Sequence, residues 1–160
     1  MIEDIKNEKT VNFLFSKLIE TKVASRVILE IVESEGIEKF EEVGDFIRKA
    51  KALGCRVAID DFGTGYSSLS YLSDLEVDFI KIDRKFVLDL NKEKGKKVLR
   101  DIINISHSIG CKVIIEGVEN ESQLQLIKIF GADFVQGFYF HKPNTYDNTM
   151  EYIRKQNYTF

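Results

Sequence analysis

The chain has 160 residues, of which 44% are hydrophobic and 31% charged, and its formal charge is −3. This balance is typical of one folded domain, and it excludes a disordered chain. The slight acidity argues against binding to a nucleic-acid polymer or through a basic membrane anchor. We see no membrane-spanning run or signal peptide, and we expect two reduced, buried cysteines, Cys55 and Cys111. The expected location is cytoplasmic, with no membrane association.

Short apolar runs alternate with longer amphipathic ones along the chain. The short runs are predicted strands: Val27–Ile31, Arg56–Asp60, Phe79–Ile82, Lys112–Glu116 and Phe134–Phe138. Because these runs are almost wholly apolar, we expect strands that are buried on both faces.

The longer runs carry apolar stripes at helical spacing. Their members are Val11, Leu14, Phe15 and Leu18; Val43, Phe46, Ile47, Ala50 and Leu53; Val98, Ile102, Ile105 and Ile109; and Leu124, Ile127 and Phe130. A last helix is expected within Asn144–Phe160, with Tyr146, Met150 and Ile153 turned inward. This alternation of strands and helices predicts a parallel α/β protein.

The chain contains an internal repeat. The segment GCRVAID at 54–60 recurs as GCKVIIE at 110–116, and VDFIK at 77–81 recurs as ADFVQ at 132–136. The offsets are nearly equal, 56 residues (54 to 110) and 55 residues (77 to 132). Such a repeat favours a partial TIM-like (β/α) barrel of about five parallel strands with flanking helices. An open flavodoxin-like sheet is the alternative.

Each predicted strand ends on or beside a polar side chain. In chain order these are Glu30, Asp60 with Asp61, Lys81, Glu116 and Gln136. A parallel barrel gathers the carboxyl ends of its strands on one face, where active sites lie. These residues are either strand ends that meet water or parts of one site. Since all five strands share the feature, we predict one site.

Carboxylates outnumber cations in this set, and Glu33 and Asp83 add to them. Gathered on one face, they would repel one another without bound cations. Oxygen-rich clusters suit Mg²⁺ or Mn²⁺. The adjacent pair Asp60 and Asp61 suggests a two-metal site, with ions about 3.5–4 Å apart, as is usual for phosphodiester hydrolysis.

A glycine-containing segment, DFGTGYSSL at 61–69, follows the second strand. It is either a tight turn that leads into a capped helix or a mobile loop over a phosphate substrate. Because no Gly-Lys-Ser/Thr follows, it is not the phosphate loop of nucleoside triphosphatases.

Five motifs, taken in their order along the chain, resemble those of one family, the EAL domain. Members of this family are cyclic di-GMP phosphodiesterases with a TIM-like barrel. The motifs are EIVES at 30–34, DDFGTGYSSL at 60–69, KIDRKFV at 81–87, EGVE at 116–119 and VQGF at 135–138, with Lys142-Pro143 beyond. The resemblance implies that residues 1–143 are the C-terminal part of such a domain and that 144–160 form its last helix.

The resemblance also implies an activity, the hydrolysis of cyclic di-GMP to linear pGpG with Mg²⁺ or Mn²⁺. The implied metal ligands are Glu30, Asp60 and Asp61, and the implied catalytic residues are Lys81, Glu116 and Gln136. In the family, the lysine positions water or steadies charge, the glutamate is a base or a metal-water ligand, and the glutamine orients the site. Glu33 is implied to anchor a substrate loop that contains Gly63, Thr64 and Gly65.

The sequence departs from the family because it has no Glu-Ala-Leu tripeptide. An asparagine ligand expected before the Met1–Ile5 stretch is also absent. We therefore expect little turnover by the isolated chain, and two open sheet edges that favour a homo-oligomer. Two alternatives stay open: a degenerate, non-catalytic module that binds a nucleotide or a protein, and a self-associating half-barrel.

Overall fold

The computed structural model describes residues 2–32, 40–63 and 74–155. Its elements in chain order are α1 (Ile2–Lys6), α2 (Glu8–Thr21), η1 (Ala24–Arg26), β1 (Ile28–Val32), α3 (Phe40–Ala52), β2 (Arg56–Phe62), β3 (Phe79–Ile82), α5 (Arg84–Leu88), η3 (Asp89–Asn91), α6 (Glu93–Ser108), β4 (Lys112–Ile115), α7 (Glu121–Phe130), β5 (Phe134–Val135) and α8 (Tyr146–Lys155). In these ranges, no helix is both long and apolar enough to cross a membrane.

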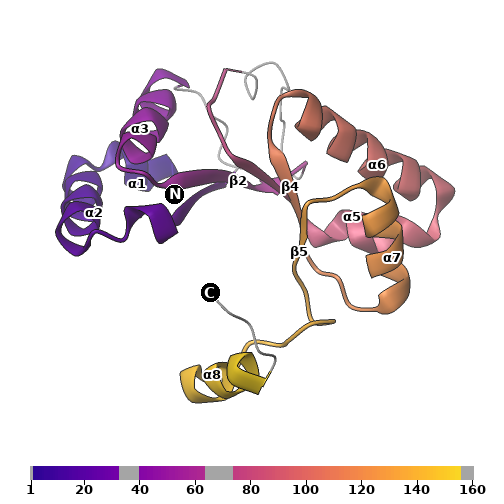
Figure 1. The fold of residues 1–160 in the computed structure, drawn as a ribbon. Helices are drawn as coiled ribbons and strands as arrows, with labels where there is room; N and C mark the ends of the chain where they lie inside the picture. Colours follow the sequence, from indigo (N-terminus) through magenta and orange to yellow (C-terminus); the bar gives the residue numbers. More distant parts are fainter. Residues whose placement is uncertain (1, 33–39, 64–73, 156–160) are drawn as a thin grey trace.

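The strands form one parallel sheet in the order β1-β2-β3-β4-β5 (Figure 1). Each strand therefore lies beside the next one along the chain, as in a (β/α) barrel. A flavodoxin-like sheet would instead reverse its strand order at a switch point. The sequential order confirms the partial barrel. Among the described strands, β1 and β5 are the edges, with one neighbour each.

The predicted strands are confirmed, but only β3 has the predicted bounds, and β2 and β5 differ most at their carboxyl ends. Strand β2 extends two residues beyond the prediction, to Phe62. Strand β5 stops at Val135, although the Gln136 N–H still donates to the Ile115 carbonyl at 2.8 Å. Gly137 then passes so close to β4's continuation that an added Cβ would lie 2.1 Å from the Val118 carbonyl oxygen. The apolar run through Phe138 thus leaves the ladder at a close backbone approach.

The expectation that every strand is buried on both faces is correct for β3 and wrong for β1, β4 and β5. All four residues of β3 are buried, whereas burial alternates with exposure along β4. One face of the sheet carries Ile31, Ile59 and Ile80, which belong to the main core with the helices. Ala58 and Phe79 are also buried but lie outside that core cluster, on the opposite face.

Helices α2, α3, α6 and α7 bury their apolar stripes against the main core. The predicted stripes of α2, α3 and α7 are confirmed, but that of α6 is only half correct, since Ile102 and Ile109 pack against the core. Leu99, Ile103 and Ser106 are the buried residues of α6, while Val98 and Ile105 are exposed. Because Ser106 is polar, the buried face of α6 does not read as a continuous apolar stripe in the sequence. Its hydroxyl can be buried because it donates to the Ile102 carbonyl at 2.9 Å, within the same helix.

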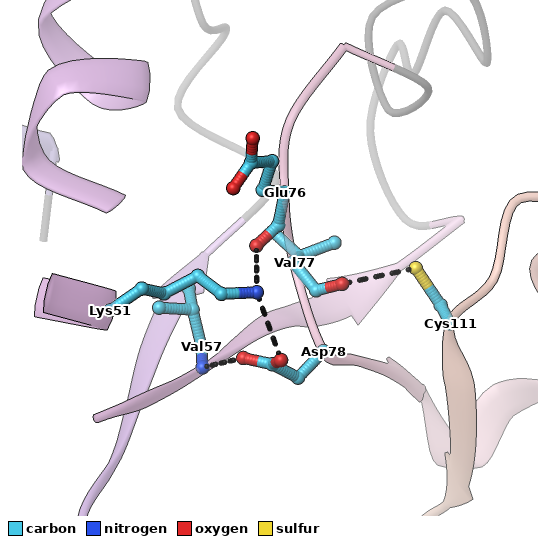
Figure 2. Close-up of polar contacts among 6 residues, drawn as sticks. All are labelled: Lys51, Val57, Glu76, Val77, Asp78 and Cys111. Carbon is cyan, nitrogen blue, oxygen red and sulfur yellow. Dashed lines mark hydrogen bonds and ion pairs between the residues drawn. The ribbon is translucent and has the colours of Figure 1, made fainter. Parts of the chain in front are cut away.

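The internal repeat has a structural counterpart at the amino ends of the strands. Asp78, before β3, accepts the Val57 N–H at 2.8 Å and pairs with Lys51 at 3.0 Å. Figure 2 shows these contacts, together with the bonds from Lys51 to the Glu76 carbonyl and from Cys111 to the Val77 carbonyl. Each carboxylate oxygen of Asp78 thus has its own donor.

The second copy of this arrangement lies one repeat further along. Asp133, before β5, accepts the Val113 N–H at 2.8 Å and pairs with His107 at 2.9 Å. His107 thus takes the place of Lys51. Both aspartates tie the start of one strand to its neighbour and to the preceding helix.

Helix α8 lies apart from the other helices, beyond β5 (Figure 1). Met150 and Ile153 are half-buried as expected, whereas Tyr146 is 76% exposed and does not turn inward. Tyr152 donates to the Phe140 carbonyl at 3.2 Å, and its ring lies 4.3 Å from that of His141. These contacts fasten α8 to the segment that follows β5.

Candidate active site

A buried lysine stands at the carboxyl ends of the strands. Lys81 on β3 is only 6% exposed, and its Nζ contacts carboxylates from three other strands or their continuations. The contacts are with Glu30 at 2.9 Å, Asp60 at 2.8 Å and Glu116 at 2.8 Å. The structure therefore brings together four of the predicted residues.

Two opposing effects act on the pKa of Lys81. Burial favours the neutral amine and lowers the pKa, but the hydrogen bonds with Asp60, Glu116 and Glu30 favour the ammonium and outweigh burial. The net result is a pKa raised above the ordinary value. Lys81 is therefore a permanent cation, and one positive charge faces three carboxylates.

Asp60 and Asp61 both reach the site although neighbouring residues of a strand normally point to opposite faces. The β2–β3 register shifts between Ile59 and Phe62, and Asp61 has a φ of 56°, in the left-handed region. This bulge turns consecutive side chains to the same edge, and aspartate is among the few residues that tolerate such a backbone. Asp60, Asp61 and Glu116 each bring a carboxylate oxygen within 4.8 Å of the others.

Asp60, Asp61 and Glu116 are here called the acidic group. This group differs in two residues from the metal ligands that the resemblance implied. Glu116, which the resemblance implied as catalytic, lies with Asp60 and Asp61. Glu30, an implied ligand on the edge strand β1, contacts Lys81 and does not belong to this group within the described part of the chain. Asp83 is a helix cap, since its carboxylate accepts the Lys85 N–H at 3.0 Å at the start of α5.

The glycine segment is described only at its start. Gly63 has a φ of +84°, and an added Cβ would lie 2.7 Å from the Phe86 ring, so the position requires glycine. The Lys85 ammonium donates to the Gly63 carbonyl. Sequence reasoning missed this contact because Lys85 lies on a different element. The other predicted loop residues, Glu33, Thr64 and Gly65, lie outside the described residues.

A groove of about 520 Å³ opens beside the acidic group. Glu116 and Gln136 line it from the two last strand ends, and Arg84, Phe138 and Lys142 add positive charge and an aromatic surface. The Lys142 ammonium lies 5.7 Å from the centre of the Phe138 ring. The groove thus joins two cations and an aromatic ring to three carboxylates, since Asp83 and Glu119 line it together with Glu116.

Comparison with known proteins identifies the family. The model of the EAL domain matches residues 1–143. This chain belongs to the EAL domain family. The probable cyclic di-GMP phosphodiesterase PdeG of Escherichia coli is 36% identical over 128 residues, which are 79% of this chain and 25% of PdeG.

Solved EAL structures share the fold of this chain. The EAL domain of Mycobacterium smegmatis DcpA matches with a TM-score of 0.85 and 32% identity, over 95% of this chain and 69% of that chain. Klebsiella pneumoniae BlrP1, in a complex with manganese and cyclic di-GMP, matches with a TM-score of 0.75 and 29% identity, over 85% of this chain and 35% of that one. The first curated relatives are much longer, and the EAL chain spans 16% and 19% of two of them.

Proposed function

We propose that this EAL chain carries part of a metal-dependent phosphodiesterase site that hydrolyses cyclic di-GMP to linear pGpG. The observation that carries the proposal is the charge imbalance at the strand ends, where Lys81 alone faces Glu30, Asp60 and Glu116. An EAL relative bound to manganese and cyclic di-GMP supports the choice of cofactor and substrate.

The residues present fit a divalent cation. Asp60, Asp61 and Glu116 offer three oxygen donors within 4.8 Å of one another, and carboxylate oxygens are what Mg²⁺ and Mn²⁺ prefer. Such ions polarise a phosphoryl oxygen and lower the pKa of bound water. We assign Glu30 to the same group, with two ions as the full complement.

The side chains of this EAL chain would then have separate roles in the reaction. Lys81, held charged by its partners, balances part of the negative charge on the substrate phosphate. Glu116 belongs to the acidic group and also lines the groove, where it can accept a proton from the attacking water. Gln136 orients the substrate from β5, and Glu33 with Gly63, Thr64 and Gly65 would form the substrate loop.

We propose further that the isolated chain turns over slowly and self-associates. Glu30 lies on an edge strand and its side chain is 44% exposed, so one wall of the site is open to water. Exposure of the site to water weakens the electrostatic stabilisation of a transition state. The exposed edges favour pairing with another chain.

The test is incubation of the chain with cyclic di-GMP and Mn²⁺, with pGpG followed by chromatography. We expect slow, metal-dependent product that Asp60→Asn abolishes. The matched control is Asp101→Asn, the same chemical change on the exposed side of α6, which should leave the rate unchanged.

The outcomes separate the alternatives. Product that survives Asp60→Asn or metal removal by EDTA contradicts the proposal. If no product forms, nucleotide titration decides next: binding that depends on Lys81 and Mn²⁺ identifies a non-catalytic nucleotide-binding module, and no binding overturns the assignment of substrate.

A further inference from the structure

The short helix α5 contacts both backbone segments that carry the acidic group. It begins directly after Asp83, whose carboxylate accepts the Lys85 N–H at 3.0 Å, and this cap lies two residues beyond Lys81. Its residues then contact a glycine after β2 and a glycine after β4, Gly63 and Gly117. Each of these glycines lies within two residues of a carboxylate of the acidic group.

On the side of β2, α5 holds the backbone that follows Asp61. The Phe86 ring packs so closely on Gly63 that an added Cβ would lie 2.7 Å from it. The Lys85 ammonium donates to the Gly63 carbonyl and lies 5.0 Å from the centre of the Phe86 ring. A ring and a cation thus fix Gly63, two residues beyond Asp61.

The backbone of Asp61 has a conformation that needs such support. Its φ of 56° lies in the left-handed region, and the register between β2 and β3 shifts between Ile59 and Phe62. A residue other than glycine keeps a rare backbone conformation only where its surroundings impose it. The contacts between Gly63 and α5 supply part of that constraint.

On the side of β4, α5 holds the backbone that follows Glu116. Gly117 has a φ of +73°, and an added Cβ would lie 3.2 Å from the Arg84 Cα and closer still to the Arg84 Cβ. The first residue of α5 therefore approaches the backbone directly after Glu116. The Glu116 N–H also donates to the Ile82 carbonyl at 3.1 Å, which fastens the same residue to β3.

We propose that α5 is a positioning element for the acidic group. Lys85 and Phe86 act on Asp61 through the glycine that follows β2. Arg84 acts on Glu116 through the glycine that follows β4. Helix α5 thereby sets the spacing of the carboxylate oxygens, which lie within 4.8 Å of one another. Residues that orient metal ligands in this indirect way commonly change metal affinity by about 10–100-fold when they are replaced.

This inference rests on the metal site of the proposed function but not on catalysis, so the readout is Mn²⁺ binding by isothermal titration calorimetry. For Lys85→Met we expect the Mn²⁺ dissociation constant to rise at least about tenfold. The free energy of unfolding in EDTA should stay close to the wild-type value, because Lys85 is exposed. Lys85→Arg keeps a donor for the Gly63 carbonyl and should restore the affinity. Lys94→Met, the same change at an exposed position of α6, should leave it unchanged.

A second pair of variants separates the glycine contact from backbone strain. Gly63 and Gly110 have nearly the same φ, +84° and +82°, but an added Cβ at Gly110 meets nothing within 4 Å. Gly63→Ala should weaken Mn²⁺ binding at least about tenfold, whereas Gly110→Ala should lower only the free energy of unfolding. Circular dichroism checks that each variant folds. If Gly63→Ala does not fold, Phe86→Leu replaces it, with the same expected loss of affinity.

The outcomes distinguish this inference from the proposed function. Wild-type Mn²⁺ affinity in either Lys85→Met or the Gly63 variant overturns the role of α5, and so does an equal loss of affinity in the control variants. A wild-type chain that binds no Mn²⁺ overturns the metal site and this inference together. Mn²⁺ binding that follows these expectations without release of pGpG supports the positioning role and contradicts only the proposed catalysis.

Discussion

The two ends of the same parallel strands use the same residue types in opposite ways. At the amino ends, Asp78 meets the Lys51 ammonium and one backbone N–H, and Asp133 meets the His107 ring and one backbone N–H one repeat later. At the carboxyl ends, Lys81 is shared by three carboxylates, with Asp61 near two of them.

The difference is one of charge balance. The aspartates of the amino ends are satisfied within the fold, so they stabilise it and need nothing further. The carboxylates of the carboxyl ends share too few cations, so they stabilise the fold poorly and attract an additional cation. A parallel sheet with its loops at one end can assign stability and function to opposite edges in this way.

The largest effect is expected at the shared lysine. Lys81→Met leaves three partly exposed carboxylates without their shared cation, and we expect the free energy of unfolding to fall by about 3 kcal/mol, the lower end of the range for a broken buried ion pair. Urea denaturation in EDTA measures the loss, with Lys94→Met as the exposed control. Mn²⁺ should restore part of the stability, and an unchanged midpoint in EDTA would contradict the charge imbalance.

Removing one carboxylate should separate binding from stability. Asp60→Asn leaves Lys81 with two acidic partners, so we expect little change in the free energy of unfolding. The same change removes a donor from the acidic group, and Mn²⁺ affinity should fall at least about tenfold. Isothermal titration calorimetry measures the Mn²⁺ affinity of the variant and of the wild type. An unchanged affinity would exclude Asp60 as a ligand.

The opposite result is expected at the amino ends. Asp78→Ala leaves the Val57 N–H and Lys51 without their acceptor, and the free energy of unfolding should fall by about 2 kcal/mol. Mn²⁺ affinity should stay at its wild-type value. A loss of metal binding in a folded Asp78→Ala protein would show that the two edges are not separate.

The smallest effect is expected in the pH dependence of the free energy of unfolding at acidic pH. Burial raises the pKa of Asp133, but the Val113 N–H and His107 outweigh it and hold the pKa below the ordinary 3.8. The ionised group therefore stabilises the fold above that value, and the stabilisation is lost as pH falls through the folded-state pKa. Unfolding curves between pH 7 and pH 3 should show a shallower acid loss for Asp133→Asn than for wild type.

Sequence reasoning predicted the five parallel strands because each is a short apolar run between helical stripes. It also named four polar residues that the structure brings together, Glu30, Asp60, Lys81 and Glu116, since each lies at or near the carboxyl end of a strand. It misjudged α6, where a buried serine interrupts the stripe, and it missed the Lys85 contact with the Gly63 carbonyl. Both errors concern polar groups whose partners lie one turn or one element away.

The sequence by itself determined the fold class, the repeat and the identity of the residues at the strand ends, because these depend on local periodicity and order. Only the tertiary structure decided that one lysine serves three carboxylates and that a bulge turns Asp60 and Asp61 to the same edge. These features depend on register and on distances between strands far apart in the chain, which no local pattern records.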